Sequence, residues 1–323
     1  MLKIYSPSNL SPFDRPAIFR LEGDASQAGD AIDLLLEDTE TGTLLAARRI
    51  RLDDSAAARF DAAPVLRRAM MLQPAGGPTG VAGAAGCRFR VRVSAGGAQS
   101  DEVTLICTAP KRNALTMMSQ LPERRTIRRG ESDVLVFYAM SDIELHVEVQ
   151  TDGGVQSHPF RWTGEAGLVE LRLRTEDFGA GARRIAVFAN NSPMAEYEVE
   201  PPAADSLRLA WRNDAGIIEH YTFSVVGRKL CASERRSVRL ADGVCTVAAE
   251  AHEEIRLASV CECAAVTDVL ARIVSSPQVW VVDGETDSYV GVEVVTREVV
   301  TRSFGEPANV ELTVRPSQNG VRL

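Results

Sequence analysis

Short segments of alternating apolar and polar residues constrain this chain more than any other feature. In Cys87–Val93, with the sequence CRFRVRV, apolar side chains fall on one face of an extended strand and arginines on the other. Val310–Val314 alternates in the same way. Because turn-forming residues separate such segments at intervals of about 8–12 residues, the pattern predicts a mostly β protein built from sandwiches.

Two proline-containing segments divide the chain. With 323 residues, it is long enough for two or three domains of about 100–150 residues each. Pro110–Thr116 and Pro201–Ala204 are predicted linkers. The expected domains are a β-sandwich over residues 1–109, an immunoglobulin-like or fibronectin type III-like sandwich over 117–201 and a β-rich domain over 206–323. Inside the first domain, the Gly, Ala and Pro content of Gln73–Gly86 predicts a mobile loop.

One amphipathic helix is expected in the third domain, over about residues 265–274. Val266, Val269, Leu270 and Ile273 follow the i, i+3, i+4, i+7 spacing of a single apolar helix face. Ser275–Pro277 is expected to end the helix. A helix beside several strands gives this domain an α+β character.

A β-hairpin is predicted at Leu207–Ser224. Alternating residues lie on both sides of the turn formers Asn213–Gly216, which suit a tight reversal. This hairpin is the first candidate for a contact with a partner protein. The candidate contact residues in it are Trp211, Asn213, Gly216, Tyr221 and Phe223.

A second candidate contact is a basic cluster after the first linker, formed by Arg124, Arg125, Arg128 and Arg129. One interpretation is a contact with an acidic partner. The other is a solvated face whose charge is balanced by neighbouring glutamates, and the sequence favours this second interpretation.

No motif indicates catalysis. The four histidines, the scattered carboxylates and the cysteines lie outside any recognised nucleophile elbow, phosphate loop or dinucleotide fingerprint. A glycosidase-type pair of carboxylates stays open as an alternative. Cys261 and Cys263 with His252, joined by Cys231 or Cys245, could hold zinc, but packed free thiols are favoured. The sequence therefore predicts a non-catalytic protein with no catalytic, cofactor-binding or metal-binding residue.

Net charge and hydropathy limit the classes of partner that this chain is expected to bind. A net charge of −8 argues against a nucleic-acid binder, which is usually basic. No apolar run approaches the roughly 18 residues that would span a bilayer, so no membrane insertion is expected. Met1–Pro7 lacks the apolar core of a signal peptide, so we expect a cytoplasmic chain that is not exported by the Sec pathway. Free thiols fit that compartment.

The third domain resembles a known family. The hairpin pattern W-x-N-x-x-G followed by Y-T-F, together with the helix, Ser-Ser-Pro and strand of Val269–Trp280, resembles phage and prophage structural proteins from Bacteroidales-type bacteria. The resemblance covers about residues 206–323. Proteins of this family are minor virion components near the tail. The resemblance implies a role in assembly through other virion proteins, possible homo-oligomers, and a location in the cytoplasm during assembly and then in the virion.

Two other functions stay open. A bacterial cell-surface adhesin, or an array of carbohydrate-binding modules, also uses strings of immunoglobulin-like domains, and the missing export signal argues against it. A β-sandwich hydrolase would need two carboxylates in a groove.

Overall fold

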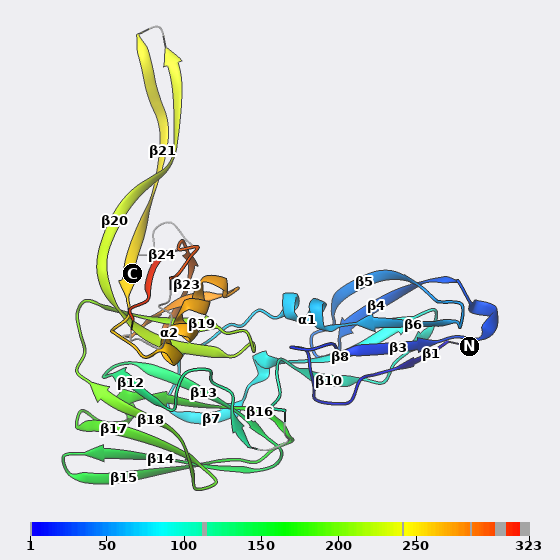
Figure 1. Cartoon of the computed structure of the whole chain (residues 1–323), viewed down its shortest axis with the longest axis horizontal. Coiled ribbons are helices and arrows are strands. Elements are labelled where there is room, and N and C mark those ends of the chain that lie inside the picture. The colour runs from blue at the N-terminus through cyan, green and yellow to red at the C-terminus, as the bar shows by residue number, and fades with distance from the viewer. Residues whose placement is uncertain (1, 112–114, 241, 285, 301–307, 317–323) are drawn as a thin grey trace.

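Two β-sandwiches and a closed β-barrel make up the computed structural model, and a long hairpin projects from the barrel (Figure 1). The structure describes residues 2–111, 115–240, 242–284, 286–300 and 308–316. The predicted mostly β fold, with sandwiches first and an α+β part last, is confirmed. Among the described residues, none of the helices has the length and apolar character needed to cross a membrane.

The first sandwich packs a three-stranded sheet against a six-stranded one. Its first sheet has the order β1-β3-β6, and the second has the order β2-β10-β8-β4-β5 with β9 beside β8. β2 runs parallel to β10 and the other pairs are antiparallel, which is the layout of an immunoglobulin-like sandwich. The elements are β1 (Lys3–Tyr5), β2 (Ser11–Pro12), β3 (Ile18–Glu22), η1 (Ala25–Gln27), β4 (Ala31–Asp38), β5 (Thr43–Arg51), β6 (Ala57–Asp61), α1 (Ala63–Ala69), η2 (Ala85–Cys87), β8 (Arg88–Ala95), β9 (Ala98–Gln99) and β10 (Val103–Ile106).

The second sandwich repeats this layout. One sheet has the order β11-β13-β16-β7, and the other has the order β12-β18-β17-β14-β15, with β12 parallel to β18. All eight residues of β13 are buried, since the barrel covers the face of this strand that the sandwich core does not. The elements are β7 (Gly80–Gly83), β11 (Thr116–Met117), β12 (Arg124–Arg128), β13 (Ser132–Ala139), β14 (Ile143–Thr151), β15 (Gly154–Trp162), β16 (Gly167–Arg174), η3 (Thr175–Phe178), β17 (Ala182–Ala189) and β18 (Ser192–Glu200).

β7 comes from the segment for which the sequence predicts a mobile loop, and that prediction is wrong for Gly80–Gly83. The strand leaves the first sandwich and pairs antiparallel with β16 of the second, with Val81 opposite Leu171. It covers an edge of β16 that would otherwise expose unpaired backbone groups. Its small residues permit a close approach, because a Cβ on Gly83 would lie 3.2 Å from the Trp162 ring. The first 109 residues therefore contribute to both sandwiches.

The third unit is a six-stranded antiparallel barrel with the order β19-β20-β21-β24-β23-β22. The predicted helix is present as α2 followed by the 3₁₀ turn η4, and its residues Leu270 and Ile273 are fully buried in the barrel core. The elements are β19 (Ser206–Arg212), β20 (Ile218–Leu240), β21 (Gly243–Ala258), α2 (Ala264–Ala271), η4 (Arg272–Ser275), β22 (Val279–Asp283), β23 (Ser288–Val294) and β24 (Glu311–Pro316).

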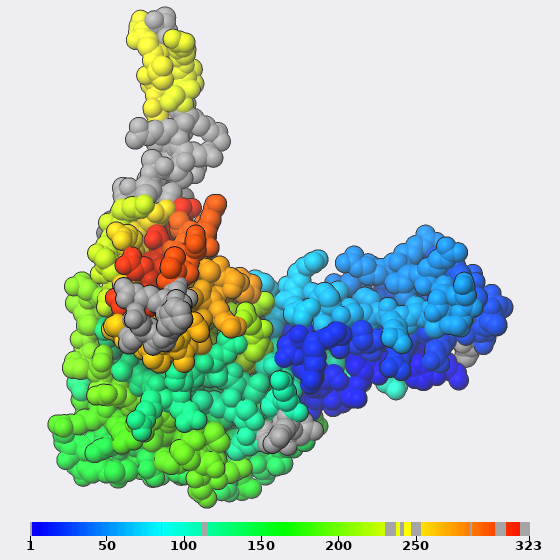
Figure 2. All heavy atoms as spheres, viewed as in Figure 1, coloured from blue at the N-terminus to red at the C-terminus, as the bar shows by residue number. Residues whose placement is uncertain are grey.

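Strands β20 and β21 are much longer than the barrel needs. β19 pairs with β20 only up to Ser224, and β24 pairs with β21 only from Ile255 onward. Between these points the two strands pair only with each other, among the residues that the structure describes. We call this part, residues 226–254, the ribbon. Its tip stands clear of the rest of the molecule (Figures 1 and 2).

The three units form one body. The hydrophobic core of the first sandwich continues into Val136 of the second and into Ala210 and Trp280 of the barrel. Polar contacts follow the same junctions: the Gly77 N–H donates to Asp287 Oδ2 at 2.8 Å and joins the segment before β7 to the barrel. The barrel and its ribbon are therefore fixed to a rigid base.

Replacing Gly76 with alanine is expected to weaken this junction. A Cβ on Gly76 would lie 2.2 Å from the backbone oxygen of Asp287, so one of the two backbones must move. Crowding of this kind costs about 1–3 kcal/mol. Gly153→Ala is the matched control, since its Cβ would meet only the Thr151 side chain at 3.8 Å. Chemical denaturation should show a loss of stability for Gly76→Ala and none for Gly153→Ala. Equal denaturation midpoints for the two variants would contradict the close contact.

Candidate functional site

Most of the hairpin residues predicted to contact a partner lie inside the molecule. Trp211 and Phe223 are 1% and 0% exposed in the barrel core, and Asn213 is buried in the turn that follows β19. The prediction is wrong for these three residues. The alternation turns Trp211 and Phe223 into the closed barrel, and the Asn213 side chain is held in the turn by hydrogen bonds with Glu219 and with the backbone of the turn. Gly216, with φ +82°, packs against the first sandwich near Cys107. Tyr221 is half-buried, and its hydroxyl donates to Glu262 at 2.6 Å.

The four arginines after the first linker do not form one surface. Arg124 and Arg129 are exposed. The Arg128 side chain is 16% exposed and lies 3.7 Å from Glu200. Arg125 has a side chain only 7% exposed and lies inside the protein, so the prediction of a surface contact is wrong for this residue. Its burial makes it part of the polar site described next.

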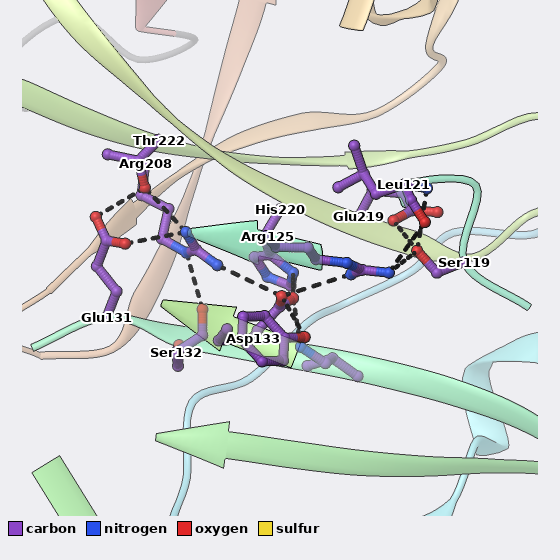
Figure 3. A network of polar contacts seen from close by, with 12 residues as sticks. Ser119, Leu121, Arg125, Glu131, Ser132, Asp133, Arg208, Glu219, His220 and Thr222 are labelled. Carbon is purple, nitrogen blue, oxygen red and sulfur yellow. Dashed lines mark hydrogen bonds and ion pairs between the residues drawn. The ribbon is translucent and has the colours of Figure 1, made fainter. Parts of the chain in front are cut away.

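A buried ionic cluster joins the second sandwich to the barrel, with Asp133 of β13 at its centre (Figure 3). The Tyr197 hydroxyl donates to Asp133 Oδ2 at 2.9 Å. Arg125 and Arg208 place guanidinium nitrogens 3.7 and 3.8 Å from the same oxygen. His220 Nδ1 lies 3.0 Å from Asp133 Oδ1. We call Arg125, Asp133, Tyr197, Arg208 and His220 the Asp133 cluster.

The charge on Asp133 is set by these neighbours. Burial alone would raise its pKa, but the contact with His220 and the charges of Arg208 and Arg125 outweigh burial. Together they hold the pKa of Asp133 well below its usual range. A carboxylate is therefore present at neutral pH, and it compensates two buried guanidinium groups that come from different units of the fold.

The two ring nitrogens of His220 have different partners. Burial lowers its pKa below the usual value, against the opposing effect of Asp133, so the ring is neutral at neutral pH. Nε2 lies 3.0 Å from the Tyr289 hydroxyl. Burial raises the pKa of Tyr289 to about 12, so this hydroxyl keeps its proton and can donate a hydrogen bond to Nε2. Nδ1 lies close to the Asp133 carboxylate without an aligned hydrogen bond, so the contact between the two side chains is electrostatic.

Further polar groups extend the cluster on both sides. Arg208 donates to Glu131 Oε2 at 3.0 Å and to the backbone oxygen of Ser132 at 2.8 Å. On the other side, Glu219 of the barrel accepts from Ser119 Oγ at 2.6 Å and from the Asn213 amide at 2.9 Å. The contacts cross repeatedly between the second sandwich and the barrel, which fixes how the two units are oriented.

The arrangement can hold charge and orient the units. An aspartate beside a histidine is common in catalytic sites; here Nδ1 of His220 lies 3.0 Å from Asp133 without an aligned hydrogen bond, and Nε2 lies 3.0 Å from the Tyr289 hydroxyl. A pocket of about 220 Å³ opens onto the cluster, and its lining includes Arg125, Asp133 and His220 as well as Tyr221 and Glu262. No group of three or more His, Cys, Asp or Glu side chains suited to a metal occurs within the described part of the chain.

Cysteines and tryptophans are more scattered than a shared site requires. Cys245 lies near the tip of the ribbon, whereas Cys261 and Cys263 lie beside the start of α2. Trp162 differs from the two buried tryptophans, since it lines a groove of about 470 Å³ between the sandwiches together with Arg88 and Arg90. The side chains of Cys231 and His252 lie outside the described residues.

Sequence reasoning missed Asp133 and Arg208. The available signal was a single aspartate in the otherwise apolar strand SDVLVFYA, where both strand faces are buried. A charge in such a strand needs a partner of opposite sign. The sequence does not say that the partners come from residues 208 and 220, because the barrel brings them there only after it has closed.

Acid is expected to destabilise the protein through His220. Its pKa in the folded chain lies below the unfolded value of about 6.5, so its contribution is complete above that pH and decreases as the pH falls below it. The slope for one proton is at most about 1.4 kcal/mol per pH unit. His220→Asn replaces the ring with a polar side chain that does not titrate.

The measurement compares the denaturant midpoints of the wild-type protein and the His220→Asn protein, each at pH 7.5 and at pH 5.5. Burial raises the pKa of Glu219, which acts in the opposite sense in both proteins and is removed by the comparison. The His220→Asn protein should lose less stability between the two pH values. Equal losses would contradict a neutral, buried His220.

Comparisons with known proteins do not place this chain in a family. No family model matches the chain, and no curated protein matches it. Among solved structures, the crystal structure of the teleost fish polymeric Ig receptor ectodomain covers 62% of this chain and 100% of its own, at 10% identity and a TM-score of 0.20. A TM-score this low carries no argument, so the description of the two sandwiches as immunoglobulin-like rests on their strand pairing.

Proposed function

We propose that this chain is a non-catalytic structural protein that works through contacts with other proteins, as a tail-associated component of a phage or prophage particle. The ribbon is the observation that carries the proposal. A two-stranded hairpin alone is at best marginally stable in water, so a long projection has a use when another chain covers it.

The rest of the fold supports this interpretation. Strand β7 joins the first sandwich to the second, the hydrophobic core runs through all three units, and the Asp133 cluster links the second sandwich to the barrel. Together these contacts hold the three units in one orientation. A protein that must place other proteins at a fixed position benefits from a rigid base of this kind. The resemblance of residues 206–323 to phage and prophage structural proteins supplies the assignment to a tail.

The test uses particles released by a strain that carries the gene. After separation on a density gradient, the chain should sediment with tail proteins in a constant ratio, and deletion of the gene should give particles with incomplete tails in electron micrographs. A chain that stays with free proteins, while the deletion strain makes normal particles, would overturn the proposal.

The adhesin alternative makes a different prediction for the same protein. A carbohydrate-binding chain would retain glycans as a monomer. Trp162→Ala would then remove binding in the groove between the sandwiches, because aromatic rings supply the apolar face on which a sugar packs. Glycan binding lost in this variant would favour the adhesin over a virion component.

A further inference from the structure

The ribbon has two open backbone edges. Beyond Val225, β20 pairs on one side only, with β21, and between Gly243 and Glu254, β21 pairs only with β20, among the described residues. Each outer edge therefore carries backbone donors and acceptors that can accept another strand. The tip stands clear of both sandwiches, so a second chain can reach it without meeting them (Figures 1 and 2).

Apolar side chains on the ribbon face solvent. Val226, Val238 and Val244 are 55%, 46% and 71% exposed. β-branched residues suit a covered sheet, and such a sheet needs three or more strands to be stable by itself. The ribbon thus exposes apolar side chains of a kind that suits a covered sheet, and among the described residues no third strand pairs with it.

The two strands of the ribbon differ in charge. The β20 part is basic and the β21 part has no lysine or arginine. The basic residues of the β20 part are Arg228, Lys229, Arg235, Arg236 and Arg239, beside a single Glu234. The acidic residues of the β21 part are Glu250, Glu253 and Glu254, and Asp242 precedes the strand in the turn.

Opposite charges already pair across the strands inside one ribbon. Arg228 lies 3.3 Å from Glu253, and Lys229 lies 2.9 Å from Glu254. Cross-strand pairs of opposite charge stabilise a sheet, and like charges directly opposite destabilise it. An edge that carries one sign of charge therefore rejects a copy of itself and accepts the other edge.

We propose that the ribbon pairs edge to edge with the ribbons of further copies of this chain, with β20 of one copy beside β21 of the next. This inference rests on the proposed structural function and adds the partner and the contact surface. The pairing continues the antiparallel order of the hairpin, since each new β20 follows a β21. Two β20 edges or two β21 edges do not pair, because each such contact brings like charges together.

The basic residues of β20 and the acidic residues of β21 also lie at matching positions along the ribbon axis. Near the base, Arg228 and Glu253 lie at neighbouring levels, and near the tip Arg239 lies at the level of the turn that contains Asp242. Copies placed side by side thus match basic with acidic residues at both ends without sliding along the ribbon axis. A contact between two different edges is heterologous, so it continues from copy to copy and forms a ring where the rotation closes.

A pair of charge-reversed variants of the full chain tests the proposal. The first, Arg228→Glu with Arg239→Glu, leaves three basic and three acidic residues in the β20 part, so that edge loses its net positive charge while the β21 edge stays acidic. The second, Asp242→Lys with Glu253→Lys, leaves two basic and two acidic residues in the β21 part and its turn, so that edge loses its net negative charge while the β20 edge stays basic. Light scattering coupled to size exclusion, over a range of concentrations, should show self-association of the wild type and a weakening of about tenfold or more in each variant by itself. An equimolar mixture of the two variants should associate again.

Two further proteins serve as controls. Arg49→Glu with Arg183→Glu changes the net charge as the first variant does, on side chains 75% and 72% exposed in the two sandwiches, and should associate like the wild type. Replacing residues 230–253 with Asn-Gly shortens the ribbon to a two-residue hairpin turn after Lys229 and should give monomers. Higher salt should weaken the wild-type assembly.

The outcomes separate this inference from the proposed function. A wild type that stays monomeric, a shortened ribbon that still associates, or a mixture that fails to associate again would overturn edge-to-edge pairing. Incorporation into particles is measured separately. A wild type that enters particles while the ribbon variants self-associate normally would remove only the ribbon inference, whereas a wild type absent from particles would remove the proposed function.

Discussion

Replacing Asp133 with asparagine is expected to lower the free energy of unfolding by about 3–5 kcal/mol, the usual result of removing one partner from a buried ion pair. Asparagine has nearly the same shape, so little packing is lost. The loss is electrostatic, because Arg125 and Arg208 keep their buried charges without the carboxylate between them. Arg208 keeps its ion pair with Glu131 at 3.0 Å, so the buried charge left without compensation is mainly that of Arg125.

The same substitution at an exposed ion pair is the control. Asp152 lies 2.6 Å from Arg183, with side chains 67% and 72% exposed. Asp152→Asn should change the unfolding free energy by less than about 1 kcal/mol, since water screens such pairs. Guanidinium denaturation followed by tryptophan fluorescence measures both variants. A difference of less than about 1 kcal/mol between the two would mean that Asp133 is not ionised in the folded chain.

Asp133→Asn is also expected to alter cooperativity. Asp133 belongs to the second sandwich, whereas Arg208 and His220 belong to the barrel. A weakened cluster leaves the two units less firmly joined, so the variant should unfold over a broader denaturant range with a lower apparent slope. The wild-type chain should show one steep transition.

The sequence was informative where the structure depends on local order. Alternation in Cys87–Val93 locates β8, and the apolar spacing through Leu270 and Ile273 locates α2 and η4. Both patterns follow directly from the geometry of strands and helices. Turn residues at Asn213–Gly216 marked the reversal between β19 and β20 for the same reason.

The sequence was uninformative where distant segments meet. Nothing near Gly80–Gly83 indicates that this strand pairs with β16, because its short, small side chains are also typical of a loop. Closure of the barrel requires Leu209 to pair with Val281, far along the chain, and a hairpin pattern predicts only the nearer partner, Tyr221. The candidate contact residues were misplaced as a consequence, because a strand face that looks open in a hairpin is enclosed in a barrel.

Trp211→Ala is expected to cost about 3–5 kcal/mol of unfolding free energy, as truncation of a large buried aromatic does. The side chain is 1% exposed and packs in the barrel core, so its removal leaves a cavity that the barrel strands cannot fill. Leu44→Ala removes an apolar side chain that is 56% exposed and should change stability by less than about 0.5 kcal/mol. Denaturation midpoints measure both.

Trp211→Phe separates burial from a contact role. The indole Nε1 of Trp211 is buried and has no hydrogen-bond partner within the described part of the chain, so the tryptophan already pays for an unsatisfied donor. Phenylalanine removes that donor and keeps most of the apolar volume, and it should therefore cost much less than alanine. If Trp211 contacted a partner instead, both substitutions would weaken assembly and leave stability unchanged. Self-association measured on the folded variants, below their unfolding midpoints, distinguishes the two cases, and we expect it to equal that of the wild type.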